Sequence, residues 1–183
     1  MKILTGALRG HPILFKPNPH LRPTADKIRK AIFDMLRGSL EGARILDLFS
    51  GTGALGLEAL SSGASFVTFV EMDEGQALTI EKNLEKLGLY EQGEVISSDA
   101  LRAIEKFSNE DRQFDFVFMD PPYEEGLGLK ALAAFVQSKI LSEEALIVFE
   151  CRESETLPHP DNLECAKDKV YGDTRLVIYR RNY

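Results

Sequence analysis

The 183-residue sequence has few of the side chains that form disulfides or bind metals. It contains two cysteines, Cys151 and Cys165, and three scattered histidines, His11, His20 and His159. The cysteines form no CxxC pair and lack the spacing of metal ligands, so we expect two reduced, partly buried thiols. A disulfide framework and a zinc site are therefore not expected, and no metal cofactor is predicted.

Long hydrophobic runs are also missing. The longest apolar stretches, such as Ala145–Phe149, are far too short to cross a bilayer, and the N-terminus has neither the apolar segment nor the cleavage site of a signal peptide. We therefore expect a cytoplasmic protein with no membrane partner. The apolar content of 44% is enough for a full core, and the length fits a single domain over residues 1–183.

An excess of positive charge is missing everywhere except near the N-terminus. The net charge is −7, but residues 1–43 carry +5 and the remainder carries −12. The basic residues of the first part are Lys2, Arg9, Lys16, Arg22, Lys27, Arg29, Lys30 and Arg37. A basic extension (1–43) on an acidic core (44–183) is expected if one edge of the protein meets phosphate. A solvated charged face is the alternative.

From residue 43 onward, short apolar segments alternate with helical patterns, which is typical of an α/β fold with a mostly parallel sheet. The expected strands are Arg44–Phe49, Ser65–Met72, Gly93–Ser98, Phe114–Met119 and Ala145–Arg152. Helices are expected over Glu74–Leu87 and Lys130–Lys139, and a terminal antiparallel hairpin over Leu163–Tyr171 and Arg175–Arg181.

The first residues predict a small hairpin and helix attached to this core. Met1–Phe15 has strand-like pieces broken around Gly6 and Gly10. Thr24 can cap a helix over Ala25–Arg37, whose apolar residues fall on one face.

Arg22-Pro23-Thr24 precedes that helix, and Lys27 lies off its apolar stripe. Pro23 restricts the backbone, and the helix start carries partial positive charge. We therefore expect Arg22, Thr24 and Lys27 to meet a phosphate or the active-site edge. Ordinary helix capping is the competing interpretation.

A glycine-rich turn joins the first expected strand to a helix. Gly51, Gly53 and Gly56 match GxGxxG, and Glu71 follows Gly51 by twenty positions, so a dinucleotide site has to be considered. However, Asp47 at the strand end suits a ligand that carries an ammonium group and suits a pyrophosphate badly. The pattern Asp-x-x-x-Gly-x-Gly is also the one that S-adenosylmethionine (SAM) enzymes use.

Acidic residues also end the next two strands. Glu71 is placed to accept hydrogen bonds from the ribose hydroxyls of SAM, and Asp99 from its adenine amino group. Each acid alone is better explained as a helix cap or a loop carboxylate, but three acids after successive parallel strands indicate one ligand site. The residues expected to bind the cofactor are Asp47, Phe49, Gly51, Thr52, Gly53, Glu71, Met72, Asp99 and Ala100.

Asp120-Pro121-Pro122-Tyr123 follows the fourth expected strand at the same edge. The tetrapeptide looks like the catalytic motif of enzymes that methylate planar amino groups. Asp120 can accept one N–H of an exocyclic amine and a proline carbonyl the other, which leaves the nitrogen lone pair aimed at a methyl donor. Tyr123 offers a ring for base stacking, worth roughly 1–3 kcal/mol. Taken alone, the tetrapeptide is equally consistent with a proline turn.

Over nearly its whole length the chain resembles the RsmD family. The matching segments are the start around Gly6 and Gly10, Leu21-Arg22-Pro23-Thr24, residues 47–60, Asp120-Pro121-Pro122-Tyr123 and Tyr171-Gly172-Asp173-Thr174-Arg175-Leu176. The sequence departs from the family pattern in a less basic segment around Ala7, Leu8 and His11, and in Ser50, where alanine is commoner.

The resemblance implies a Rossmann-like class I SAM-dependent methyltransferase that modifies the N2 amine of a guanine in 16S ribosomal RNA. Its expected partner is ribosomal RNA within the small ribosomal subunit, and we expect a monomer. Transfer is expected to be direct, with Asp120 orienting the amine and receiving its proton. The alternatives are an adenine-N6 methyltransferase, an NAD-dependent oxidoreductase and a non-catalytic RNA-binding module.

Overall fold

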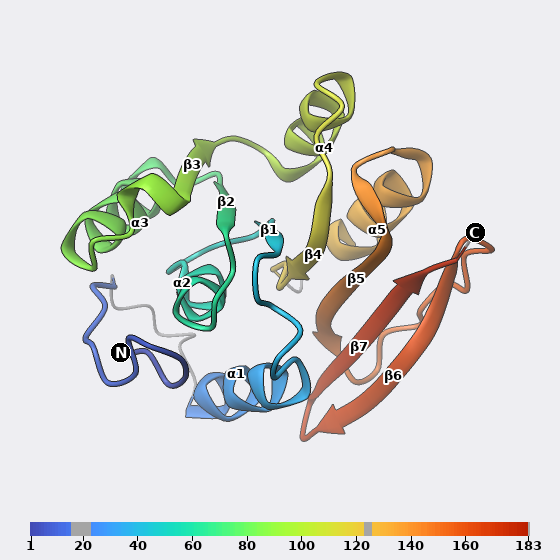
Figure 1. The fold of residues 1–183 in the computed structure, drawn as a ribbon. Helices are drawn as coiled ribbons and strands as arrows, with labels where there is room; N and C mark the ends of the chain where they lie inside the picture. The colour runs from blue at the N-terminus through green and yellow to red at the C-terminus, as the bar shows by residue number, and fades with distance from the viewer. Residues whose placement is uncertain (16–22, 123–125, 183) are drawn as a thin grey trace.

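The computed structural model describes the backbone of residues 1–15, 23–122 and 126–182, and the side chains of these residues except 23–25 (Figure 1). In this part of the chain, seven strands form one sheet in the order β3-β2-β1-β4-β5-β7-β6. Their bounds are β1 Arg44–Asp47, β2 Phe66–Glu71, β3 Gly93–Ser97, β4 Phe114–Met119, β5 Leu141–Arg152, β6 Leu163–Tyr171 and β7 Thr174–Arg181.

Strands β1 to β5 run parallel, and β7 lies antiparallel between β5 and β6. The mostly parallel sheet and the C-terminal antiparallel hairpin are thereby confirmed. The parallel strands alternate apolar side chains between two faces, and each face is covered by helices, as expected for a buried parallel sheet.

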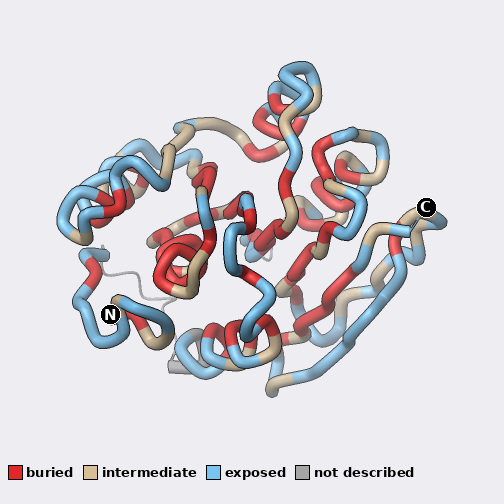
Figure 2. The backbone as a smooth tube through the Cα atoms, in the orientation of Figure 1, coloured by how far each residue is buried: buried red, intermediate tan, exposed pale blue. Residues whose placement is uncertain are grey.

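Two apolar layers cover the sheet. Helices α1 (Pro23–Met35), α2 (Ala54–Ser61) and α3 (Glu74–Lys86) pack on one face, and α4 (Ala100–Asn109) and α5 (Leu127–Gln137) on the other. Buried segments follow the central strands and the helix sides that touch them (Figure 2). None of the helices in the described ranges is long and apolar enough to cross a membrane.

Most element boundaries lie within two residues of the predicted ones; α1, for example, begins at Pro23, so Thr24 lies inside the helix and is not its cap. Two element starts differ by more. Strand β5 begins at Leu141 rather than Ala145, because the buried Leu141 pairs with Phe114 ahead of a register irregularity. The exposed Glu143 and Glu144 interrupt the apolar pattern, so the sequence did not predict this earlier start. Helix α5 begins at Leu127 instead of at the predicted Lys130, directly after Gly126 in a left-handed conformation with φ of 61°.

The first fifteen residues form the predicted small hairpin as a short, irregular pairing: an isolated antiparallel bridge joins Lys2 to Pro12, Ile3 N donates to His11 O at 3.0 Å, and Ile3 O accepts from Gly10 N at 2.8 Å. The next backbone donors, those of residues 4 and 5, bind α2. Glu58 of α2, which is 1% exposed, accepts hydrogen bonds from Leu4 N at 2.6 Å and Thr5 N at 3.0 Å. A buried carboxylate thus takes the place of a strand partner.

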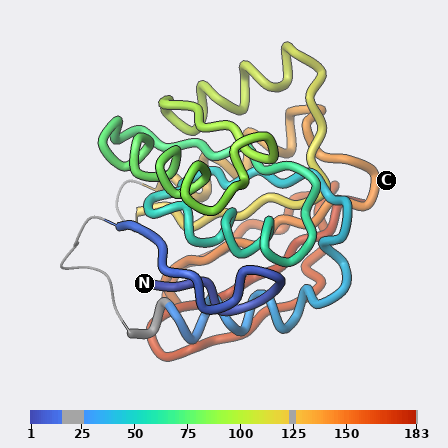
Figure 3. The backbone as a smooth tube through the Cα atoms, turned by 60° about the vertical axis from the view of Figure 1, so that its left-hand side comes forward, coloured from blue at the N-terminus to red at the C-terminus, as the bar shows by residue number. Residues whose placement is uncertain are grey.

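Gly6 allows the same segment to approach α2 closely (Figure 3). Its φ of +73° is left-handed, and a Cβ there would overlap the carbonyl of Ser61. The next amide, Ala7 N, donates to that carbonyl at 2.7 Å. The N-terminal segment therefore packs on the core, and Ile3 and Ile13 belong to the same apolar cluster as α1 and α2.

Candidate functional site

The candidate site lies where the chain order of the sheet reverses. From β1 the chain proceeds outward to β2 and β3 and then returns to β4 on the other side of β1. Because these strands are parallel, their carboxyl ends share one edge, and ligands in such sheets bind at this switch point. The predicted acidic residues all follow these strand ends, so the fold brings them to one rim.

In the glycine turn after β1, the backbone at the first glycine is free of close side-chain neighbours, whereas the third glycine is closely packed. Gly51 has φ of 53°, and a Cβ on it would meet nothing nearer than Gln76 Oε1 at 4.0 Å. At Gly56 a Cβ would instead overlap the ring of Phe69 on β2. The first glycine leaves room for a ligand beside the main chain, whereas the third lets α2 lie directly on the sheet.

Asp47 ends β1 and is 2% exposed. Its Oδ2 accepts a hydrogen bond from Gly56 N at 2.9 Å, so this carboxylate caps the first turn of α2. Burial raises its pKa to about 7, opposed by the Gly56 N–H and reinforced by the negative charges of Asp120 and Glu71. No described residue donates to Oδ1, which leaves one oxygen for a ligand.

Glu71 ends β2 and fixes the glycine turn from the other side. Its Oε2 accepts from Gly51 N at 2.7 Å, and its Oε1 accepts from Asp73 N at 2.8 Å. Each carboxylate oxygen has a second lone pair, so hydroxyl donors can still bind Glu71.

Asp99 is the N-cap of α4. Its Oδ1 accepts from Leu101 N at 3.0 Å and Arg102 N at 3.1 Å, while no described residue donates to Oδ2. The capping interpretation is therefore correct for Asp99, and it leaves the outer oxygen available to an amino group.

The other predicted cofactor residues surround the same edge with differing exposure. Met72 is 73% exposed, which is unusual for a large apolar side chain. Phe49 and Thr52 are half-buried, and Ala100 is buried at the start of α4. Met72 thus adds exposed apolar surface directly after Glu71.

Asp120 directly follows β4, and its side chain reaches solvent. Surrounding protein atoms nevertheless displace part of the hydration water of the carboxylate, which raises the pKa of Asp120 to about 6. The next residue, Pro121, is buried against α5. A Cβ on Gly128 of that helix would lie 2.8 Å from Pro121 Cγ and 2.7 Å from the Phe149 ring. The first turn of α5 therefore holds the Asp120-Pro121-Pro122 backbone in place.

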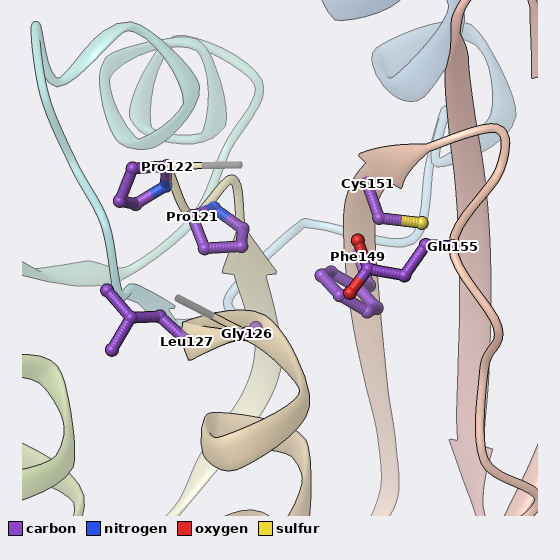
Figure 4. A pocket seen from close by; sticks show the side chains of 8 residues that line it. Pro121, Pro122, Gly126, Leu127, Phe149, Cys151 and Glu155 are labelled. Atoms are coloured by element: carbon purple, nitrogen blue, oxygen red, sulfur yellow. The ribbon is translucent and has the colours of Figure 1, made fainter. Parts of the chain in front are cut away.

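A small recess lies between the two prolines and the end of β5 (Figure 4). Its cavity volume is about 10 Å³, which is room for roughly one water molecule. Pro121, Pro122 and Leu127 form one side, and Phe149, Cys151 and Glu155 form the other. The recess cannot hold a nucleobase, whereas the Asp120 carboxylate is open to solvent.

Glu150 of β5 belongs to this edge although no sequence motif includes it. Burial raises its pKa to about 8, and the charge of Asp120 adds to the rise. In the sequence, Glu150 is recognisable only as a charged residue between Phe149 and Cys151, both of which are buried. This position does not indicate a functional residue until the neighbouring strand, and with it Asp120, is known.

The structure does not test every predicted contact. Arg22, Tyr123 and the side chain of Thr24 lie outside the described residues. Lys27 is exposed on α1, the helix whose Phe33 ring packs 5.7 Å from that of Phe118 on β4. Their contacts with a substrate stay predictions.

The four carboxylates of this edge, Asp47, Glu71, Asp120 and Glu150, leave their negative charge uncompensated. None of the ion pairs formed among the described side chains involves any of them. Acidic groups that raise one another's pKa values favour a cationic ligand and disfavour an anionic one. No described cluster of His, Cys, Asp and Glu has the arrangement of a metal site.

Comparison with known proteins agrees with this geometry. A family model described as "Conserved hypothetical protein 95" matches residues 1–180. The ribosomal RNA small subunit methyltransferase D of Buchnera aphidicola subsp. Acyrthosiphon pisum is 33% identical over 97% of this chain and 91% of its own. The putative rRNA methyltransferase YlbH of Bacillus subtilis is 34% identical over 99% of both chains.

The fold is also found among solved structures. The putative methyltransferase yhhF from Escherichia coli superimposes with a TM-score of 0.88 and 30% identity over 100% of this chain and 98% of its own. The similarity therefore extends from the N-terminal segment to the C-terminal hairpin.

Proposed function

The chain belongs to the RsmD family, the one that the conserved hypothetical protein 95 model describes, and on this premise we propose that it is a SAM-dependent ribosomal RNA methyltransferase. We further propose that the methyl acceptor is the exocyclic N2 amine of a guanine in small-subunit RNA. The observation that carries the proposal is the acidic rim at the carboxyl edge, where the expected cofactor residues adjoin Asp120-Pro121-Pro122.

The charge of the rim supports SAM over a dinucleotide. Asp47, Glu71 and Asp120 present uncompensated negative charge beside the glycine turn, which the pyrophosphate of NAD would meet unfavourably. SAM carries a sulfonium and an ammonium group, and both are attracted to such a rim.

The available acceptors also fit SAM group by group. Asp47 Oδ1 would accept from the ammonium group, Glu71 from the ribose hydroxyls and Asp99 Oδ2 from the adenine amine. The surroundings of these three acids would be completed by Phe49, Gly51, Thr52, Gly53, Met72 and Ala100. When bound, SAM would supply an electrophilic methyl group, whose C–S bond breaks in the transfer and leaves the neutral thioether S-adenosylhomocysteine.

Asp120 and the prolines would prepare the amine. The Asp120 carboxylate accepts one N–H and a proline carbonyl accepts the other, so the lone pair leaves conjugation with the ring. The amine loses a proton as its new N–C bond forms, and Asp120, whose pKa is about 6, can receive it near neutral pH. Orientation accounts for most of the rate, since two fixed acceptors reduce the entropy cost of alignment.

Ribosomal RNA as the substrate is supported by the relatives and by charge. The Buchnera and Bacillus relatives are named as rRNA methyltransferases. In this chain the residues proposed to meet RNA are Arg22, Thr24, Lys27 and the ring of Tyr123. They belong to the basic N-terminal segment or directly follow the prolines, so phosphate and base contacts would flank the same carboxylate.

The test is methyl transfer to the natural particle. Small ribosomal subunits from a strain that lacks the gene are incubated with the purified protein and SAM labelled in its methyl group, and the RNA is digested to nucleosides. We expect labelled N2-methylguanosine at one position. Labelled N6-methyladenosine would select the adenine alternative, and RNA binding without any transfer would indicate a non-catalytic module.

A further inference from the structure

Glu150 and Asp120 come from neighbouring parallel strands and lie side by side. In the register of β4 and β5, Phe118 pairs with Val148 and Met119 with Phe149. One step further, the same register places Asp120 next to Glu150. Strands in a sheet are about 4.8 Å apart, so the backbones of the two residues lie close enough for both side chains to contact a single planar ring.

The two side chains also point to the same face. Phe118 and Val148 belong to the apolar cluster that contacts α1, whereas Met119 and Phe149 belong to the opposite cluster. Alternation along a strand then turns Asp120 and Glu150 toward the α1 face. The small recess at Pro121 and Phe149 opens on the other face, so it does not compete for these carboxylates.

No described residue compensates Glu150. Its side chain takes part in no hydrogen bond or ion pair with the described residues, and the residue beside it on β7 is the apolar Leu176. A half-buried carboxylate beside another carboxylate disfavours folding, and the pKa of Glu150, raised to about 8, reflects this. Such an arrangement contributes nothing to packing, but it suits a ligand that carries adjacent N–H donors.

Guanine carries such donors. Its Watson–Crick edge presents the N1–H next to the N2 amine, whereas adenine and cytosine present a ring-nitrogen lone pair next to theirs. In the proposed reaction Asp120 and a proline carbonyl occupy both amine hydrogens, so the N1–H is left without a partner. An ionised carboxylate at position 150 would accept the N1–H and would repel a lone pair.

We propose that Glu150 is the residue that selects guanine, by accepting a hydrogen bond from the N1–H of the target base while Asp120 holds its N2 amine. This inference rests on the proposed function and names the group that distinguishes guanine from other amine-bearing bases. Donation from N1–H stabilises the ionised form of Glu150, so the base itself favours the state that binds it.

The test uses a base that keeps the C2 amine and loses the N1–H. 2,6-Diaminopurine has this property, because its N1 carries a lone pair. Small subunits are reconstituted with RNA that carries either guanine or 2,6-diaminopurine at the modified position, and kcat/KM for methyl transfer is compared between the two.

We expect the wild-type protein to prefer guanine by about 100-fold, as for a base contact worth up to about 3 kcal/mol. In Glu150→Gln the amide can donate to N1 or accept from N1–H, so the preference should fall by about 10-fold or more. Glu144→Gln, an exposed change on the same strand, should keep the wild-type ratio. SAM binding, measured by calorimetry, should be unchanged in both variants.

The outcomes separate the two proposals. If the wild-type protein methylates guanine and Glu150→Gln keeps the wild-type ratio while both rates fall together, Glu150 has only a structural role and the inference is wrong. If the wild-type protein transfers no methyl to guanine in the native particle, the proposed function itself fails.

Discussion

At the residue scale, the proposed chemistry depends on carboxylates whose pKa values the fold raises. Asp47 and Asp120 have raised pKa values, about 7 and about 6, primarily because protein atoms replace their hydration water. A bound cation or a hydrogen-bond donor would stabilise the ionised form of both carboxylates. Substitutions that keep shape and remove charge therefore separate the positional role of each carboxylate from its electrostatic role.

Asp120→Asn should preserve much of the orientation of the amine, because the amide oxygen accepts the same N–H. The wild-type rate at saturating SAM should rise between about pH 5 and 7, as a carboxylate with a pKa of about 6 loses its proton. The asparagine variant should be slower, and its pH profile should be flat in that range.

Asp120→Ala removes the acceptor and should lose on the order of 100-fold in kcat, since misplacement of a reacting group has effects of this size. SAM binding by calorimetry is the control. Full activity in the alanine variant that still binds SAM would exclude Asp120 from the reaction.

Asp47→Asn should weaken SAM binding by about 10-fold or more through loss of the partner for the ammonium group. It should also change the pH dependence of stability. The raised pKa of Asp47 means that its favourable contribution to the folded state is present below about pH 4 and is lost as the pH rises through about 7.

Without ligand, the free energy of unfolding of the wild-type protein should therefore decrease toward pH 8, by up to about 4 kcal/mol from this residue, and the asparagine variant should lack that decrease. Urea unfolding at several pH values measures it. An identical pH dependence in both proteins would contradict the assignment.

At the element scale, α2 has to approach the sheet closely enough to place the glycine turn. Gly56→Ala would insert a methyl group into the space of the Phe69 ring. The helix gains propensity from alanine, but overpacking should dominate and reduce the free energy of unfolding by about 1–3 kcal/mol. The double variant with Phe69→Leu should recover part of the loss, because the two side chains compete for one space.

The docking of the N-terminal segment on α2 depends on Glu58. This buried carboxylate accepts from the backbone of residues 4 and 5 and lies 3.3 Å from the guanidinium of Arg29. Glu58→Ala should destabilise the protein by about 3–5 kcal/mol, since it leaves two backbone amides without an acceptor and removes the buried partner of Arg29, whose other ion pair is with the exposed Asp26. The first residues should then become accessible to proteases, whereas the exposed Glu85→Ala should have no such effect.

At the scale of the whole molecule, the net charge is positive only in the part of the chain proposed to meet RNA. Residues 1–43 carry +5 and the rest of the chain carries −12, so the acidic body should repel RNA outside that edge. Lys27→Glu on α1 should raise the KM for small subunits by about 3- to 10-fold, and more steeply at low salt. SAM binding should be unaffected, and Lys86→Glu at the end of α3 is the matched control.

The sequence by itself determined the alternation of elements and much of the site. Strand β4 has the predicted bounds because its apolar run ends at a charged residue and two prolines, and both are local properties. Asp47, Glu71, Asp99 and Asp120 were predictable at one edge because parallel strands place their carboxyl ends together.

Only the tertiary structure decided which charges face one another. Asp120 and Glu150 are separated in the sequence by helix α5, and the pairing of β4 with β5 brings them side by side. In the same way, the packing of α2 turns Glu58 toward the N-terminal backbone. Neither contact has a local signature, because register and helix packing depend on the whole apolar core. For the same reason the sequence predicted a small hairpin in the first residues, but could not predict that the backbone of residues 4 and 5 binds a buried carboxylate of α2.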